Sequence, residues 1–419
     1  MSIKLRLTIM SFLQFFVWGA WLITIGTYCL NAKGWTFPQF GAIFSTLALA
    51  SLFMPALTGI IADKWLNAER LYGILHIVYG LILFYVPKVD DPGTLYYVIF
   101  GAMICYMPTI SLSNSIAYTI LKRDGFDVVK VFPSIRVWGT IGFIVAMWCT
   151  NLSGSKDNSN QFIIGAVGAI ILGIFSFTLP KCPPPKSIAK DAGFAEQMGL
   201  QAFKLFGNYK MALFFLFSML LGAALQLTNM YGDSFLTSFD KIEAFKDSFV
   251  VKYSTIILSI SQMSETLFIL TIPFFFFFFG IKKVMLFAML AWVLRFGLFA
   301  YGDPTAMGTV HIILSCIVYG MAFDFFNISG SLFVETSTDS SIRSSAQGLF
   351  MMMTNGVGAW LGSTVSGMVI GKYYINADGS SNWQGIWFAF AVYALVIAIL
   401  FAVLFKHKHV PEEVATVQH

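Results

Sequence analysis

Five ionisable side chains fall in or near long apolar segments of the sequence: Arg136, Glu265, Arg295, Asp324 and Glu335. A charge in the middle of a membrane helix costs about 2.5–3.5 kcal/mol on insertion scales, so it usually serves a transport pathway or a specific partner. Arg295 and Glu335 lie near the ends of their segments, where they can reach the interface or pair locally. Arg136, Glu265 and Asp324 are therefore the candidates for chemistry.

Polar and aromatic residues accompany these candidates at helical spacing. The groups are Arg136, Thr140 and Phe143; Gln226 and Asn229; Gln262 and Glu265; and Tyr319, Phe323 and Asn327, with Asp324 beside them. Their spacing places each group on one face of a helix. Amides, a guanidinium and a carboxylate can hydrogen-bond hydroxyls and ring edges, and aromatic faces can stack on a flat ring. The groups predict a water-filled cavity for a neutral, polyhydroxylated ligand with a flat ring.

The same groups have a simpler interpretation as interhelical hydrogen bonds, each typically worth under about 1–2 kcal/mol. That interpretation suffices for any single residue, but it explains the whole set less well. An intramembrane enzyme would need a nucleophile with a base, or clustered metal ligands, and the sequence has neither pattern. The five cysteines show no Cys/His metal spacing. We therefore expect no enzyme activity, no metal and no cofactor.

The composition indicates that these segments cross a membrane. Of the 419 residues, 57% are hydrophobic and only 11% are charged, whereas soluble domains carry about 25% charged residues. About 20 apolar residues span a bilayer as a helix. The predicted spans are 7–30, 40–62, 71–87, 95–120, 132–151, 161–179, 210–232, 250–278, 282–301, 308–334, 344–371 and 384–405. The predicted fold is an all-α integral membrane protein with 12 transmembrane helices.

The loops assign an orientation to these spans. Lys and Arg concentrate in the termini and the even-numbered loops, which places both termini in the cytoplasm. This bias also accounts for the net charge of +5. No basic run with interleaved polar residues indicates a nucleic-acid partner.

The longest cytoplasmic connection, 181–209, divides the chain into two halves. After Pro183–Pro185 it carries apolar residues at helical spacing: Phe194, Met198, Ala202, Leu205 and Phe206. This spacing is typical of a short amphipathic helix on the membrane surface, with a plain linker as the alternative. The predicted domains are an N-terminal six-helix bundle (1–180), a cytoplasmic linker (181–209), a C-terminal six-helix bundle (210–406) and a cytoplasmic tail (407–419). Two such halves are typical of a secondary transporter, in which they rock around a midplane site.

The loop after the second span resembles the loop motif of the major facilitator superfamily. It reads Gly59-Ile-Ile-Ala-Asp63-Lys64 and continues to Arg70, with Leu66 at a position where the motif has glycine. Gly59 would allow a close helix approach. Asp63 could pair with a helix dipole or a basic group, so that Gly59, Asp63 and Arg70 latch the two halves. A solvated charge pair is the alternative.

Seven stretches resemble the bacterial nucleoside:proton symporters of the major facilitator superfamily. They are FLQFFVWGAWL, FMPALTGIIADKWL, FPSIRVWGTIGF, LGAALQLTNMYGDSFL, SQMSETLFILTIPFF, YGMAFDFFNISGSLFVE and SSAQGLFMMMTNGVGAWLGSTVSG. The resemblance covers nearly the whole chain. It implies proton-coupled nucleoside uptake by alternating access across the bacterial inner membrane, by a monomer in the lipid bilayer.

The resemblance also implies roles by position. The implied nucleoside-contacting residues are Arg136, Thr140, Phe143, Gln226, Asn229, Gln262, Glu265, Tyr319 and Phe323. Asp324 is the implied proton carrier, and Glu265 is the alternative carrier. Related family members differ in nucleoside preference and include a xanthosine carrier, so the choice between purine and pyrimidine stays open. A proton-coupled symporter for a sugar or another small neutral polar solute is the alternative function.

Overall fold

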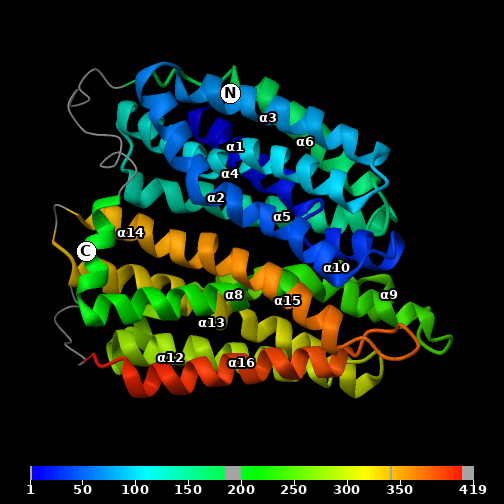
Figure 1. Cartoon of the computed structure of the whole chain (residues 1–419). Coiled ribbons are helices and arrows are strands. Elements are labelled where there is room, and N and C mark those ends of the chain that lie inside the picture. The colour runs from blue at the N-terminus through cyan, green and yellow to red at the C-terminus, as the bar shows by residue number, and fades with distance from the viewer. Residues whose placement is uncertain (1, 185–199, 340–341, 408–419) are drawn as a thin grey trace. The chain divides into compact units, whose positions relative to one another are not determined.

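The computed structural model describes residues 2–184, 200–339 and 342–407. The chain divides into two compact units, Met1–Met198 and Gly199–His419, and the long helices of each unit lie side by side (Figure 1). The described residues form helices and turns, with one isolated β-bridge between Ile375 and Ser381. The fold is therefore all-α, as the sequence predicts.

The described part of the N-terminal unit contains six long helices and two short irregular ones. They are α1 (Ile3–Gly19), the π-helix η1 (Thr27–Ala32), α2 (Phe37–Lys64), α3 (Ala68–Tyr85), the 3₁₀ helix η2 (Val86–Lys88), α4 (Pro92–Arg123), α5 (Val128–Leu152) and α6 (Asn160–Ser176). Two helix starts follow from local sequence, because the side chains of Thr36 and Asp91 cap α2 and α4, and a proline occupies the first turn of each helix.

Close contact between α1 and α5 places α5 in the N-terminal unit. A Cβ atom added at Gly142 would lie 2.1 Å from the carbonyl oxygen of Phe12, and one added at Gly19 would lie 2.7 Å from that of Phe143. Small residues let membrane helices approach closely enough for such backbone contact. The predicted site face of α5 is thereby held against α1.

The C-terminal unit contains more helical segments. They are the 3₁₀ helix η3 (Leu200–Gly207), α8 (Tyr209–Thr237), the 3₁₀ helix η4 (Ser238–Lys241), α9 (Phe249–Lys252), α10 (Ser254–Leu258), α11 (Ile260–Ile269), α12 (Ile272–Ala300), α13 (Ala306–Ser337), α14 (Arg343–Met351), the π-helix η5 (Met352–Gly358), α15 (Ala359–Tyr373) and α16 (Trp383–Leu404). Of the predicted amphipathic helix, Phe194 and Met198 lie outside the described residues, and Ala202, Leu205 and Phe206 belong to η3.

Eight of the described helices are long and apolar enough to cross a membrane individually. The sixth predicted span is the shorter helix α6. The first predicted span is interrupted by a turn and η1. The eighth is interrupted by the breaks between α9, α10 and α11, and the eleventh by η5. Gly280, with φ 71° and ψ 171°, separates the eighth span from the ninth within α12. All twelve predicted spans are thus present as helical segments.

A buried carboxylate that no pattern in the sequence indicates attaches the start of the 181–209 connection to α3. Glu69 is 2% exposed. Its Oε2 accepts a hydrogen bond from the Cys182 backbone N–H at 2.8 Å, and its Oε1 accepts one from the Asn67 amide at 3.1 Å. The Ala68 N–H in turn donates to the Cys182 carbonyl at 3.0 Å. Burial, followed by the nearby Glu69 carboxylate, raises the pKa of the Cys182 thiol to about 11.

Thiol labelling of Cys182 tests this attachment. With a pKa of about 11 the thiol is protonated at pH 7, so a protein with Cys182 as its sole cysteine should react slowly with a maleimide. Glu69→Ala removes the acceptor and exposes the thiol, whose pKa then falls toward its ordinary value, and labelling should accelerate up to roughly a hundredfold. Glu69→Gln keeps an acceptor and should stay slow. An unchanged rate in Glu69→Ala would show that Glu69 does not hold this segment.

Candidate substrate and proton site

Asp324 occupies the middle of α13 in the C-terminal unit. It is 5% exposed, and its Oδ2 is buried without a hydrogen-bond partner among the described residues. A charged group in such surroundings is costly unless it is paired. Glu265, on α11, is near enough for its carboxylate to interact electrostatically with Asp324. Two acidic groups therefore lie near each other, of which Asp324 is buried and Glu265 is half-buried.

Gly320 allows α11 to lie directly against α13. A Cβ atom added at Gly320 would come within 2.6 Å of the Ser264 carbonyl oxygen. The Ser264 hydroxyl also donates a hydrogen bond to the Ile317 carbonyl. This backbone contact holds Glu265 close to the α13 residues.

Amide groups near this contact have unused hydrogen-bonding capacity. The side-chain oxygens of Gln262 and Asn327 are buried and have no partner among the described residues. On α8, the Asn229 amide donates to the Gln226 side-chain oxygen at 3.4 Å. Buried polar atoms are nearly always hydrogen-bonded, to protein, ordered water or ligand. The unpaired oxygens can therefore accept hydrogen bonds from a hydroxylated solute.

Two aromatic rings stand beside Asp324 on the same helix. Tyr319 and Phe323 stack with their centroids 5.6 Å apart and their planes at 20°. The spacing of four residues produces this stack, because residues at i and i+4 lie on one face of a helix. Tyr319 is buried and Phe323 is half-buried, so Phe323 is the ring of this pair that can offer a flat apolar surface to a ligand ring.

The predicted residues of the N-terminal unit form a second group, on α5. The Arg136 guanidinium lies over the Phe15 ring at 4.1 Å, and Phe143, which is 8% exposed, meets the Trp18 ring edge to face at 6.2 Å. The Trp18 Nε1 is buried and has no acceptor among the described residues. No pattern in the sequence indicates a role for Trp18, although an indole N–H usually finds a partner when buried. Thr140 is half-buried on the same helix.

The two remaining ionisable candidates have different surroundings. Glu335 pairs locally with Arg343 at 2.9 Å, which confirms the expectation for this residue. Arg295 is only 2% exposed, so the expectation that it reaches the interface or forms a local ion pair is wrong. Hydrogen bonds and aromatic rings retain its guanidinium inside the unit.

The predicted latch residues lie at the end of α2 and the start of α3. No described atom lies within 4 Å of a Cβ built on Gly59, so this structure does not show the close helix approach predicted there. Asp63 and Arg70 are exposed. Neither side chain belongs to an ion pair among the described residues.

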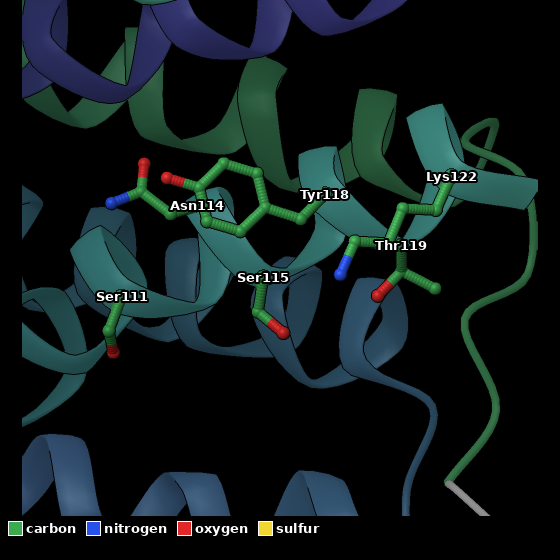
Figure 2. A pocket seen from close by; sticks show the side chains of 6 residues that line it. All are labelled: Ser111, Asn114, Ser115, Tyr118, Thr119 and Lys122. Carbon is green, nitrogen blue, oxygen red and sulfur yellow. The ribbon is translucent and has the colours of Figure 1, made fainter. Parts of the chain in front are cut away.

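A polar hollow on α4 was not selected from the sequence. Its volume is about 450 Å³ and it is lined by Ser111, Asn114, Ser115, Tyr118, Thr119 and Lys122 (Figure 2). These residues follow one another at helical spacing, a signal that was available in the sequence. Tyr118 packs on Phe132 of α5 with ring centroids 4.6 Å apart. The hydroxyl and amide groups on this face can bind water or a polar solute.

The sequence is similar to known proteins over nearly its whole length. The model of the Nucleoside H+ symporter family matches residues 1–410. The chain is 52% identical to the xanthosine permease of Escherichia coli over 99% of its length and 98% of that protein. It is also 52% identical to the E. coli nucleoside permease NupG over the whole of both chains.

Solved structures agree with this relationship. A crystal structure of the nucleoside transporter NupG superposes with a TM-score of 0.91 at 52% identity and covers 97% of this chain and 100% of that one. A D-xylose-proton symporter, at 15% identity and a TM-score of 0.69, shares the fold alone. The chain belongs to the nucleoside H+ symporter family of transporters.

Proposed function

We propose that this chain is a secondary active transporter that carries a nucleoside together with a proton into the bacterial cytoplasm. The observation that carries the proposal is the poorly hydrated Asp324 carboxyl group, which lies on α13 beside Glu265, stacked aromatic rings and unpaired amide oxygens. An ionisable residue inside a membrane protein usually marks a proton or substrate pathway. The permease names of the 52%-identical relatives support the choice of a nucleoside.

The proposal includes the predicted ligand shell and orientation. Arg136, Thr140 and Phe143 of one unit and the predicted residues of α8, α11 and α13 would contact the nucleoside in turn or together during alternating access. The chain would work as a monomer in the inner membrane with both termini in the cytoplasm. The exposed Asp63 and Arg70 would supply the charges of a latch. The polar hollow on α4 would offer water or solute contacts along the pathway.

Stacked rings favour a nucleoside over a simple sugar. Phe323, the less buried ring of its stack with Tyr319, can stack with a base, whereas a sugar presents no flat π-face. The alternative of a sugar symporter uses the amides and the carboxyl group equally well. The aromatic pair is therefore the feature that separates the two functions.

The amide shell gives a first test. Losing one buried hydrogen-bond partner leaves another polar group unpaired and costs about 1–3 kcal/mol, so Gln262→Ala and Asn229→Ala should each weaken nucleoside binding roughly 5- to 150-fold. Calorimetry on the purified variants would measure this. Wild-type affinity in both variants would show that these residues of α8 and α11 do not bind the substrate.

The aromatic residues give a second test. Phe323→Leu and Phe143→Leu keep apolar volume but remove the ring face, so each should reduce the preference for a nucleoside over free ribose, because base stacking is worth on the order of 1 kcal/mol. Competition of unlabelled ribose and uridine against labelled uridine would measure the preference. If both variants discriminate as wild type does, stacking is not the basis of selectivity.

Asp324→Asn tests the proton carrier. One proton moving down about 150 mV supplies roughly 3.5 kcal/mol, enough to concentrate a neutral solute a few hundredfold. The amide keeps the shape but cannot titrate, so proteoliposomes with an imposed pH gradient should lose accumulation of labelled uridine while the variant still binds it.

Wild-type proteoliposomes and Glu265→Gln proteoliposomes serve as the comparison. Proton entry in step with uridine in Asp324→Asn would reject Asp324 as the carrier and point to Glu265. A wild-type protein that accumulates no nucleoside under the gradient would reject the proposed function itself.

A further inference from the structure

Arg295, on α12, is a buried cation without an anionic partner among the described residues. It is 2% exposed, and none of the described ion pairs includes it. Its Nη1 donates to the Ser315 carbonyl at 2.8 Å and to the Ser261 hydroxyl at 3.3 Å. Its Nε is buried and has no acceptor there. This guanidinium is therefore held by neutral groups alone.

Aromatic rings supply the rest of its surroundings. The guanidinium carbon lies 4.4 Å from the centroid of the Tyr319 ring, 5.3 Å from that of Phe299 and 5.9 Å from that of Trp292. Trp292 meets Tyr319 edge to face at 5.8 Å and 89°. Cations within about 6 Å of a ring centroid are attracted to the ring face, more strongly when water is excluded. Tyr319 thus has its place fixed by contacts from α12.

The same guanidinium connects the helices that carry the proposed C-terminal substrate residues. Ser261 is next to Gln262 in α11, and Ser315 is one helical turn before Tyr319 in α13. The Ser315 hydroxyl also donates back to the Arg295 carbonyl at 2.9 Å. One side chain on α12 therefore ties both α11 and α13 at the level of the site.

Packing alone does not account for this choice of residue. Removing a charged group from water costs several kcal/mol, and apolar residues of similar volume often replace buried charges without loss of stability. A guanidinium has what an apolar side chain lacks: a planar cation that stacks on a ring and donors that point in fixed directions. Those properties suit a side chain that has to orient the neighbouring Tyr319 ring.

We propose that Arg295 is a positioning residue for substrate binding, which holds the Tyr319 ring in the arrangement that receives the nucleoside. The inference rests on the proposed function for its ligand. Arg295 acts through Tyr319, so its effect on affinity should vanish when that ring is absent.

A double-mutant cycle on nucleoside affinity tests the proposal. Arg295→Lys keeps the charge but loses the planar stack, and it should raise the Kd for uridine roughly 3- to 30-fold. Tyr319→Leu removes the ring and should also weaken binding. In the double variant the Kd should match that of Tyr319→Leu alone, because the two residues act as one unit. If the two increases in Kd multiply in the double variant, or if Arg295→Lys binds uridine with the wild-type Kd, the proposal is wrong.

A matched control removes another interhelical hydrogen bond of the same unit. The Tyr393 hydroxyl donates to the Leu220 carbonyl at 2.7 Å, and Tyr393→Phe should lower the Tm while leaving the Kd for uridine unchanged. If Tyr393→Phe weakens uridine binding as much as Arg295→Lys does, the loss of affinity reflects general loosening and the proposal is wrong.

Thermal unfolding without nucleoside separates this inference from the proposed function. The Tm changes of Arg295→Lys and Tyr319→Leu should be strongly non-additive even if the protein binds no nucleoside, since their contact exists in the free protein. Additive Tm changes would refute the positioning contact. If the wild-type protein binds neither uridine nor adenosine but the Tm changes are non-additive, the proposed nucleoside function is wrong and the contact between Arg295 and Tyr319 still stands.

Discussion

The C-terminal unit depends on one costly arrangement, in which ionisable groups are enclosed by apolar helices without full pairing. Asp324 has a buried oxygen with no hydrogen-bond partner among the described residues, and Arg295 is surrounded by rings and neutral donors or acceptors. Hydrocarbon offers no water to satisfy such groups, so the helices around them must be held in place by other contacts. The architecture of α11, α12 and α13 follows from that requirement.

Backbone contact at glycines supplies much of this restraint. Gly320 brings α13 against α11, and Gly222 brings α8 against η5, where an added Cβ atom would lie 2.2 Å from the Thr354 carbonyl oxygen. Since lipid is as apolar as the helix surface, close packing rather than the hydrophobic effect must hold these helices together. The π-helical turn of η5 lies at such a contact, and turns of this kind are frequent at functional sites.

The twelve spans and the helix faces could be predicted because apolar length and helical spacing are local properties of the sequence. The tertiary surroundings of individual side chains could not be predicted, because they depend on how the helices pack. Arg295 lies near the end of its segment, so sequence position suggested an interfacial residue, whereas Ser261, Ser315 and Tyr319 reach it only after α11, α12 and α13 pack. Glu69 was missed for the same reason, since its partner Cys182 lies 113 residues away. The residues of the polar hollow on α4 follow one another at helical spacing, which is visible in the sequence, but none of them is a buried charge.

In the proposed mechanism, the proton carrier and the C-terminal contacts to the nucleoside form one coupled cluster of residues. Linkage requires that a ligand which favours a protonated site draws protons from solution as it binds. Calorimetric titration of the wild-type protein with uridine, repeated in buffers of different ionisation enthalpy, measures the number of protons taken up per nucleoside. Binding enthalpies that vary with the buffer and report net proton uptake are the predicted result. Enthalpies that are independent of the buffer at every pH where uridine binds would contradict the coupling.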